Sequence, residues 1–246
     1  MLDVQVTGNI AALSIDRPKA RNALNSELVE RLATTLEELD SDPGVFAVVL
    51  EATPPGFCAG SDLKELGQMD VGEMRVHEAR TGAAARGIAL LDTPVIAAVE
   101  GFALGGGFAL AISCDIVASA TSAKWHFPEV SIGWIPPWGL RALTARVGPV
   151  VGRRLTWGMD PIDGAEAYRL GVVDYVTDNG QASAKARDLA GKIAQMPAPA
   201  VTSTKRFFAQ LVLDSGEILD AEANRMFGDN CSHEQAQETL ASFRGR

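Results

Sequence analysis

Apolar residues in the first half of the chain follow strand and helix periodicities in alternation. Residues 4–6 and 10–15 predict two strands joined by a turn at Gly8-Asn9. Leucines at helical spacing over 28–39 predict an amphipathic helix with Ser26 as its N-cap. Continuous apolar runs then predict three buried strands, at 45–50, 94–99 and 114–119. This alternation is typical of an α/β core.

Residues 63–91 are helical but polar and interrupted by glycine, so we expect a mobile segment there.

After Pro136 the hydrophobic pattern changes and becomes mainly helical. We expect a core over 1–195 and a C-terminal helical region over 196–246. The later elements are short helices at 141–147, 151–157 and 165–170, a strand at 172–176, and helices at 181–195, 199–213, 217–228 and 233–243.

Length, composition and charge restrict the class of protein. The 246 residues are 47% apolar, enough for one large α/β domain. Three scattered cysteines indicate reduced thiols, and no stretch resembles a signal peptide or a membrane span of about 18 apolar residues. We therefore expect a cytoplasmic protein without a membrane contact. The net charge of −9 argues against a nucleic-acid surface, and an anionic ligand would need a local cluster of cations.

Three consecutive glycines, Gly105–Gly107, interrupt an apolar stretch in which each costs about 0.5–1 kcal/mol in a regular element. No GK[ST] follows them and the GxGxxG spacing is missing, so neither nucleotide-binding motif applies. A second turn of small residues, GFCAGSDL at 56–63, also joins a strand to a helix. Free N–H groups at two helix starts can converge on one oxygen as an oxyanion hole. The alternatives are close helix–strand packing and a nucleophilic Ser61, although no GxSxG elbow surrounds that serine.

Four motifs in this order and spacing resemble the crotonase (enoyl-CoA hydratase/isomerase) superfamily: RPKARNALN, GFCAGSDLKE, PVIAAVEGFALGGGFALAISCDI and FPEVSIG. The resemblance implies a ClpP-like spiral of ββα units with a C-terminal helical trimerisation region. It implies a homotrimer or dimer of trimers that acts on acyl-CoA, with no metal and no cofactor beyond the CoA of the substrate. It also implies an oxyanion hole formed by the backbone N–H groups of Ser61 and Gly106. The cations that bind CoA in the family map onto Arg21, Lys64 and, less directly, Lys205, with solvated surface charge as the alternative for each.

Hydratases of this family hold water with two glutamates and one backbone N–H. One glutamate maps onto Glu129, whereas the other position is Ala109 and the N–H position is Pro137, which has no N–H. A single carboxylate resembles the 3-enoyl-CoA to 2-enoyl-CoA isomerases, in which one group moves a proton between carbons. We therefore expect double-bond isomerisation with Glu129 as the catalytic residue. A hydratase that holds water differently, a hydratase-lyase acting on an aromatic acyl-CoA, and a non-catalytic acyl-CoA binder are the alternatives.

Aromatic residues surround Glu129 in the sequence. We expect His126, Trp134, Pro137 and Trp138 to line the acyl pocket, with Trp138 as its wall. For His126 a packed or solvent-facing position is the alternative. Trp125 is assigned to the core, and Asp62 to the N-cap of the helix after the first oxyanion turn.

Overall fold

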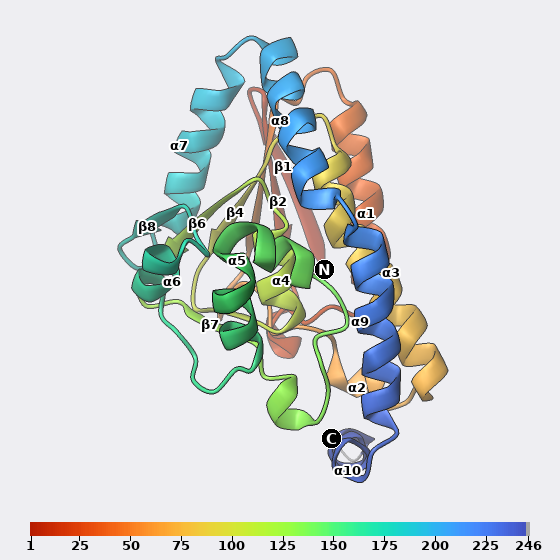
Figure 1. Cartoon of the computed structure of the whole chain (residues 1–246). Coiled ribbons are helices and arrows are strands. Elements are labelled where there is room, and N and C mark those ends of the chain that lie inside the picture. The colour runs from red at the N-terminus through yellow and green to blue at the C-terminus, as the bar shows by residue number, and fades with distance from the viewer. Residues whose placement is uncertain (245–246) are drawn as a thin grey trace.

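A six-stranded mixed sheet forms the centre of the computed structural model, which describes residues 1–244 (Figure 1). Its strand order is β1-β2-β3-β4-β6-β8, in which β1 and β2 are antiparallel and the remaining neighbours are parallel. A separate parallel pair, β5 and β7, was not predicted from the sequence. The strands are β1 (Leu2–Thr7), β2 (Ile10–Ile15), β3 (Ala47–Ala52), β4 (Val95–Val99), β5 (Phe102–Leu104), β6 (Ile116–Ala120), β7 (Lys124–His126) and β8 (Tyr175–Thr177).

Helices cover both faces of the sheet, which explains why its central strands are continuously apolar. Alternate residues of β3 point to opposite faces: Val48 and Leu50 enter the main core, whereas Ala47 and Val49 pack against α7. The helices are α1 (Ser26–Ser41), α2 (Leu63–Leu66), α3 (Val71–Gly87), α4 (Gly106–Ile112), α5 (Leu140–Thr156), α6 (Gly164–Leu170), α7 (Ala182–Ala194), α8 (Ala198–Leu213), α9 (Gly216–Cys231) and α10 (Glu234–Arg244).

The predicted α/β class and nearly all predicted elements are confirmed, with local differences at helix ends. The N-cap of α1 is Asn25 rather than Ser26, because the Asn25 side chain accepts from the backbone N–H of Leu28 at 3.1 Å. The helices predicted at 141–147 and 151–157 are the two halves of α5, which meet at Gly148, where the φ of 72° is not helical.

The segment expected to be mobile forms a packed helix. Helix α3 lies against both α1 and α9, and its N-terminus has a capping box formed by Asp70 and Glu73. Met74, Glu78 and Ala85 lie on its buried face at helical spacing. The buried face also carries His77 and Thr81, so part of the polar composition that suggested mobility lies inside the fold.

The C-terminal region is helical as predicted, and α9 runs along α3 down one side of the molecule (Figure 1). Helices α8 and α9 expose large apolar side chains, including Phe207, Phe208 and Ile218. The role of this region in trimerisation stays a prediction. No helix within residues 1–244 is both long and apolar enough to cross a membrane.

Candidate active site

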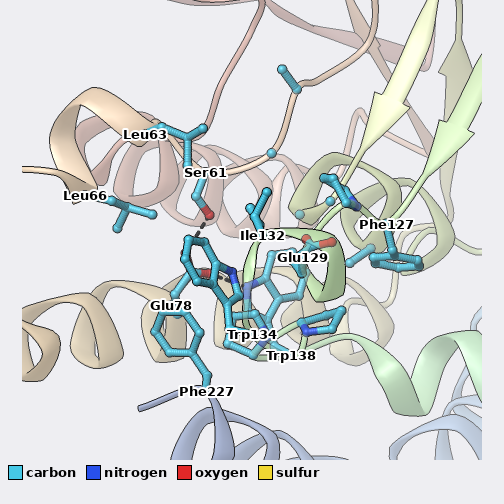
Figure 2. Close-up of a pocket in the computed structure, with 18 residues that line it drawn as sticks. Ser61, Leu63, Leu66, Glu78, Phe127, Glu129, Ile132, Trp134, Trp138 and Phe227 are labelled. Carbon is cyan, nitrogen blue, oxygen red and sulfur yellow. Dashed lines mark hydrogen bonds between the residues drawn. The ribbon is translucent and has the colours of Figure 1, made fainter. Parts of the chain in front are cut away.

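A small cavity of about 80 Å³ lies between the two glycine-containing turns, α3 and the loop before α5 (Figure 2). Its lining is apolar apart from a serine hydroxyl, two carboxylates and the indole groups of two tryptophans, and among the described residues it includes no lysine, arginine or histidine. The groups that carry the chemistry below are Ser61, Glu78, Gly106, Glu129, Trp134 and Trp138.

The two turns expected to form an oxyanion hole lie side by side. The backbone N–H of Leu104 donates to the carbonyl of Cys58 at 2.9 Å, which ties the turns together. A Cβ added to Gly60 would lie 3.2 Å from the backbone nitrogen of Gly106, so the chains are in contact where the two N–H groups begin their helices. Among residues 1–244, the N–H groups of Ser61 and Gly106 have no hydrogen-bond acceptor. Both donors are therefore available to a ligand at this cavity.

The first of the three glycines makes room for a carboxylate. Gly105 has a φ of 53°, and a Cβ at this position would lie 2.5 Å from Oε1 of Glu129. Any other side chain would be strained here and would displace Glu129. The glycines thus bring the carboxylate beside the start of α4, where Gly106 presents its N–H.

Glu129 is the most perturbed carboxyl group of the site. It is 8% exposed, and its Oε2 has no hydrogen-bond partner in the described part of the chain. Burial raises the pKa of Glu129 to about 8; its own backbone N–H opposes this rise, and the negative charge of Glu78 adds to it. A carboxyl group with a pKa near the working pH is suited to accept and return a proton.

Glu78 is a member of the site that the sequence analysis did not identify. Its Oε1 accepts from the Ser61 hydroxyl at 2.6 Å and its Oε2 accepts from the Trp138 indole N–H at 2.8 Å (Figure 2). The Ser61 hydroxyl is thus bonded to a carboxylate and not to a histidine base, which does not support a nucleophilic serine. Helical spacing from Met74 was the available signal, because it places Glu78 on the buried face of α3.

The aromatic residues divide between the cavity and the core. Trp134, Pro137 and Trp138 line the cavity as predicted, and Phe227 of α9 packs edge-on against Trp134 at a centroid distance of 5.9 Å. His126 does not line this cavity, and the packed position that was its alternative is the one observed. Its Nε2 lies 2.8 Å from the carbonyl oxygen of Gly158, outside the lining of the cavity, because β7 turns that ring toward the loop after α5.

Comparisons with known proteins agree with this geometry. The family model described as enoyl-CoA hydratase/isomerase matches residues 5–246. The chain belongs to the enoyl-CoA hydratase/isomerase family. A short-chain-enoyl-CoA hydratase of Clostridium acetobutylicum is 34% identical over 241 residues, which cover 96% of this chain and 91% of the relative. A crotonyl-CoA hydratase of Syntrophomonas wolfei is also 34% identical, over 95% of this chain and 91% of the relative.

A solved structure confirms the crotonase fold expected from the motifs. The crystal structure of an enoyl-CoA hydratase/isomerase from Mycobacterium paratuberculosis superposes with a TM-score of 0.88 at 26% identity. The match covers 98% of this chain and 97% of the other.

The positions at which family hydratases hold water are altered as the sequence indicated. Ala109 is buried, and a Cβ on Gly139 would lie 2.6 Å from the Cβ of Ala109, so the neighbouring loop is packed directly against it. Pro137 lines the cavity without an N–H, and the N–H of Gly139 already donates to Asp220 at 3.1 Å. Ala109 therefore supplies no carboxylate to a water molecule. Neither Pro137 nor Gly139 supplies a free N–H donor.

Two of the three predicted CoA contacts are exposed beside the first turn. The Arg21 carbonyl accepts from the N–H of Ala59 at 3.2 Å, and its guanidinium lies 4.6 Å from the centroid of the Phe102 ring. Lys64 is exposed in the first turn of α2, whose N-cap is Asp62, as predicted.

The structure does not support Lys205 as the third CoA contact. Only 8% of this residue is exposed, and its ammonium donates to the carbonyl of Thr93 at 2.8 Å and to Asp115 at 2.7 Å. These partners inside the fold leave Lys205 unavailable to a phosphate. The adjacent Arg206 pairs with Asp92, so the helix turns these two neighbouring cations to different partners.

Proposed function

We propose that this protein binds an acyl-CoA, stabilises the enolate of its thioester and moves a proton between carbons with Glu129. The reaction that fits best is the isomerisation of a 3-enoyl-CoA to a 2-enoyl-CoA. The observation that carries the proposal is the unpartnered Oε2 of Glu129 in a cavity next to two free backbone N–H groups.

The steps follow from this arrangement. The thioester oxygen accepts hydrogen bonds from the N–H groups of Ser61 and Gly106. Glu129 removes a proton from C2, and the electron pair enters the thioester to give a dienolate whose negative oxygen the two donors stabilise. The same carboxyl group returns the proton to C4, so that a C2–C3 double bond replaces the C3–C4 double bond.

The pKa of Glu129 suits the first step. A carboxylate whose conjugate acid has a pKa of about 8 is a far stronger base than an ordinary carboxylate, and about one-tenth of it is ionised at pH 7. Because only the ionised form removes a proton, the rate should fall as the pH falls below about 8.

Hydration of a 2-enoyl-CoA is the second candidate. Glu78 supplies another carboxylate at the cavity, and the relatives named above are hydratases. Against it stand Ala109 and Pro137, which remove two of the groups that hold water in the family. A water molecule would have to be held by Glu129 and Glu78 alone or by an N–H elsewhere in the loop.

A direct comparison of rates tests the proposal. We expect the wild-type protein to isomerise a 3-enoyl-CoA faster than it hydrates the matching 2-enoyl-CoA, over a series of chain lengths. Hydration that is faster by a factor of about ten or more would make the second candidate the principal activity.

A further inference from the structure

Glu78 is a buried carboxylate with an unusual set of neighbours. It is 3% exposed and forms no ion pair within residues 1–244. Both of its oxygens accept hydrogen bonds, one from Ser61 and one from Trp138. A buried charge is costly unless hydrogen bonds compensate it, so its retention at the cavity calls for a role.

The two hydrogen bonds connect both halves of the site. Ser61 carries one of the free N–H donors, so a bond to its hydroxyl fixes the turn that presents this donor. The Trp138 ring packs against the second donor, because a Cβ added to Gly106 would lie 3.1 Å from Cζ2 of this ring. One carboxylate on α3 thereby holds the Ser61 turn and the ring that lies on the Gly106 turn.

We infer that Glu78 is a positioning residue of the active site, which sets the relative placement of the two oxyanion donors and of the acyl-pocket wall. The inference rests on the proposed function. A carboxylate fits this role because hydrogen bonds to an ionised acceptor are about twice as strong as those between neutral groups. Since Glu78 and Glu129 are the only ionisable groups among the described residues that line the cavity, the charge of Glu78 also acts on Glu129.

Two substitutions separate position from charge. Glu78→Gln can retain both hydrogen bonds, because the amide oxygen accepts from Trp138 while the Ser61 hydroxyl reverses and accepts from the amide nitrogen. Glu78→Ala removes both bonds. Glu30→Gln is the matched control, since it removes the same charge from an exposed position on α1.

The readout is exchange of the C2 proton of an acyl-CoA into deuterated water, measured as kcat and KM over a range of pH. We expect Glu78→Ala to lower kcat about 10-fold to 100-fold, less than outright removal of an oxyanion donor elsewhere. We expect Glu78→Gln to stay within about 3-fold of wild type at its best pH, with the acid limb of its profile moved to lower pH because the like charge is gone. The indole N–H resonance of Trp138 should shift in both variants, because each changes the group that accepts from it.

Three outcomes would overturn the inference: a folded Glu78→Ala with wild-type kcat, an unmoved pH profile in Glu78→Gln, or an unmoved Trp138 resonance. If Glu78→Ala does not fold, Ser61→Ala combined with Trp138→Phe removes the same two bonds, and wild-type kcat in that pair would also overturn it. Wild-type protein without any exchange would instead refute the proposed function itself, which distinguishes the two failures.

Discussion

Glu129 combines burial, a missing hydrogen-bond partner and a neighbouring negative charge at one carboxyl group. Each of these features disfavours the ionised form in the folded protein. A residue chosen for stability alone would avoid all three. The same features make the ionised form a strong base, so the cost to stability and the proposed chemistry have one physical origin.

This cost predicts a pH-dependent gain in stability for Glu129→Gln. The carboxyl group has a pKa of about 8 in the fold against 4.5 ordinarily, so its favourable contribution is complete below about pH 4.5 and is lost as the pH rises through 8. Glutamine never ionises. The variant should therefore exceed wild type in free energy of unfolding by up to about 4 kcal/mol near pH 8.5.

Urea unfolding at about pH 4.5 and pH 8.5 measures this difference. We expect it to be small at the lower pH and large at the higher one. An equal difference at both pH values would mean that Glu129 does not carry the raised pKa.

Gly105 allows a second prediction at the scale of one residue. Gly105→Ala should reduce kcat by at least about 10-fold, because the new Cβ would meet Oε1 of Glu129 at 2.5 Å. Gly180→Ala is the control, since Gly180 also has a positive φ, of 81°, but open space around it. Gly180→Ala should lose about 1–2 kcal/mol of stability from backbone strain, and Gly105→Ala should lose more because it adds the clash with Glu129. Equal kcat values in the two variants would mean that Gly105 is not required to place Glu129.

At the scale of elements, the sequence predicted those strands, turns and helices whose formation depends on residues that are close together in the chain. The strands, the two glycine turns and the C-terminal helices depend on periodicity and turn residues that are visible within short windows. The strands β5 and β7 were missed because three residues give no period, and pairing with a distant segment creates them. Ser26 and Asn25 are adjacent candidates for one cap, and only the geometry selects the asparagine.

The site residues that lie in sequence motifs were predictable. Those whose position depends on tertiary packing were not. Ser61, Gly106 and Glu129 lie in the motifs, and the structure brings them to one cavity. Glu78 lies outside every motif, and its place depends on how α3 packs beside the Ser61 turn. His126 and Lys205 were assigned to the ligand site because a sequence shows the type of a side chain. It does not show the group inside the fold with which that side chain forms hydrogen bonds.

Lys205 gives a prediction for how α8 is held to the core. Lys205→Met should lower the free energy of unfolding by about 3 kcal/mol, because it leaves Asp115 and the Thr93 carbonyl without their ammonium partner. Lys192→Met, which breaks an exposed pair with Asp188, should cost at most about 0.5 kcal/mol. CoA affinity should be unchanged in both variants. Weaker CoA binding by Lys205→Met alone would restore this lysine to the ligand site.

At the scale of the whole molecule, the charge is unfavourable for an anionic substrate. The chain carries a net charge of −9, and the cavity itself has two carboxylates and no cation among its described lining residues. We therefore propose that exposed cations near the first turn attract the phosphates of CoA. Arg21 and Lys64 are the candidates for this role.

Lys64→Glu should weaken CoA binding about 10-fold and make the remaining affinity less sensitive to salt. Titration calorimetry at low and high ionic strength measures both effects. Lys192→Glu, a charge reversal at an exposed position on α7, is the control for the change in net charge. The same affinity for wild type and Lys64→Glu would remove Lys64 from the binding site.

The central claim is that Glu129 removes a proton from C2 of an acyl-CoA whose thioester is held by two backbone donors. The most direct measurement follows deuterium incorporation at C2 of a 3-enoyl-CoA, whose C2 protons are acidified by both the thioester and the C3–C4 double bond. Wild-type protein should exchange this proton, and Glu129→Gln should lose the exchange by at least about 10³-fold while retaining CoA affinity. Exchange by Glu129→Gln at the wild-type rate, or no exchange by the wild-type protein, would contradict the account.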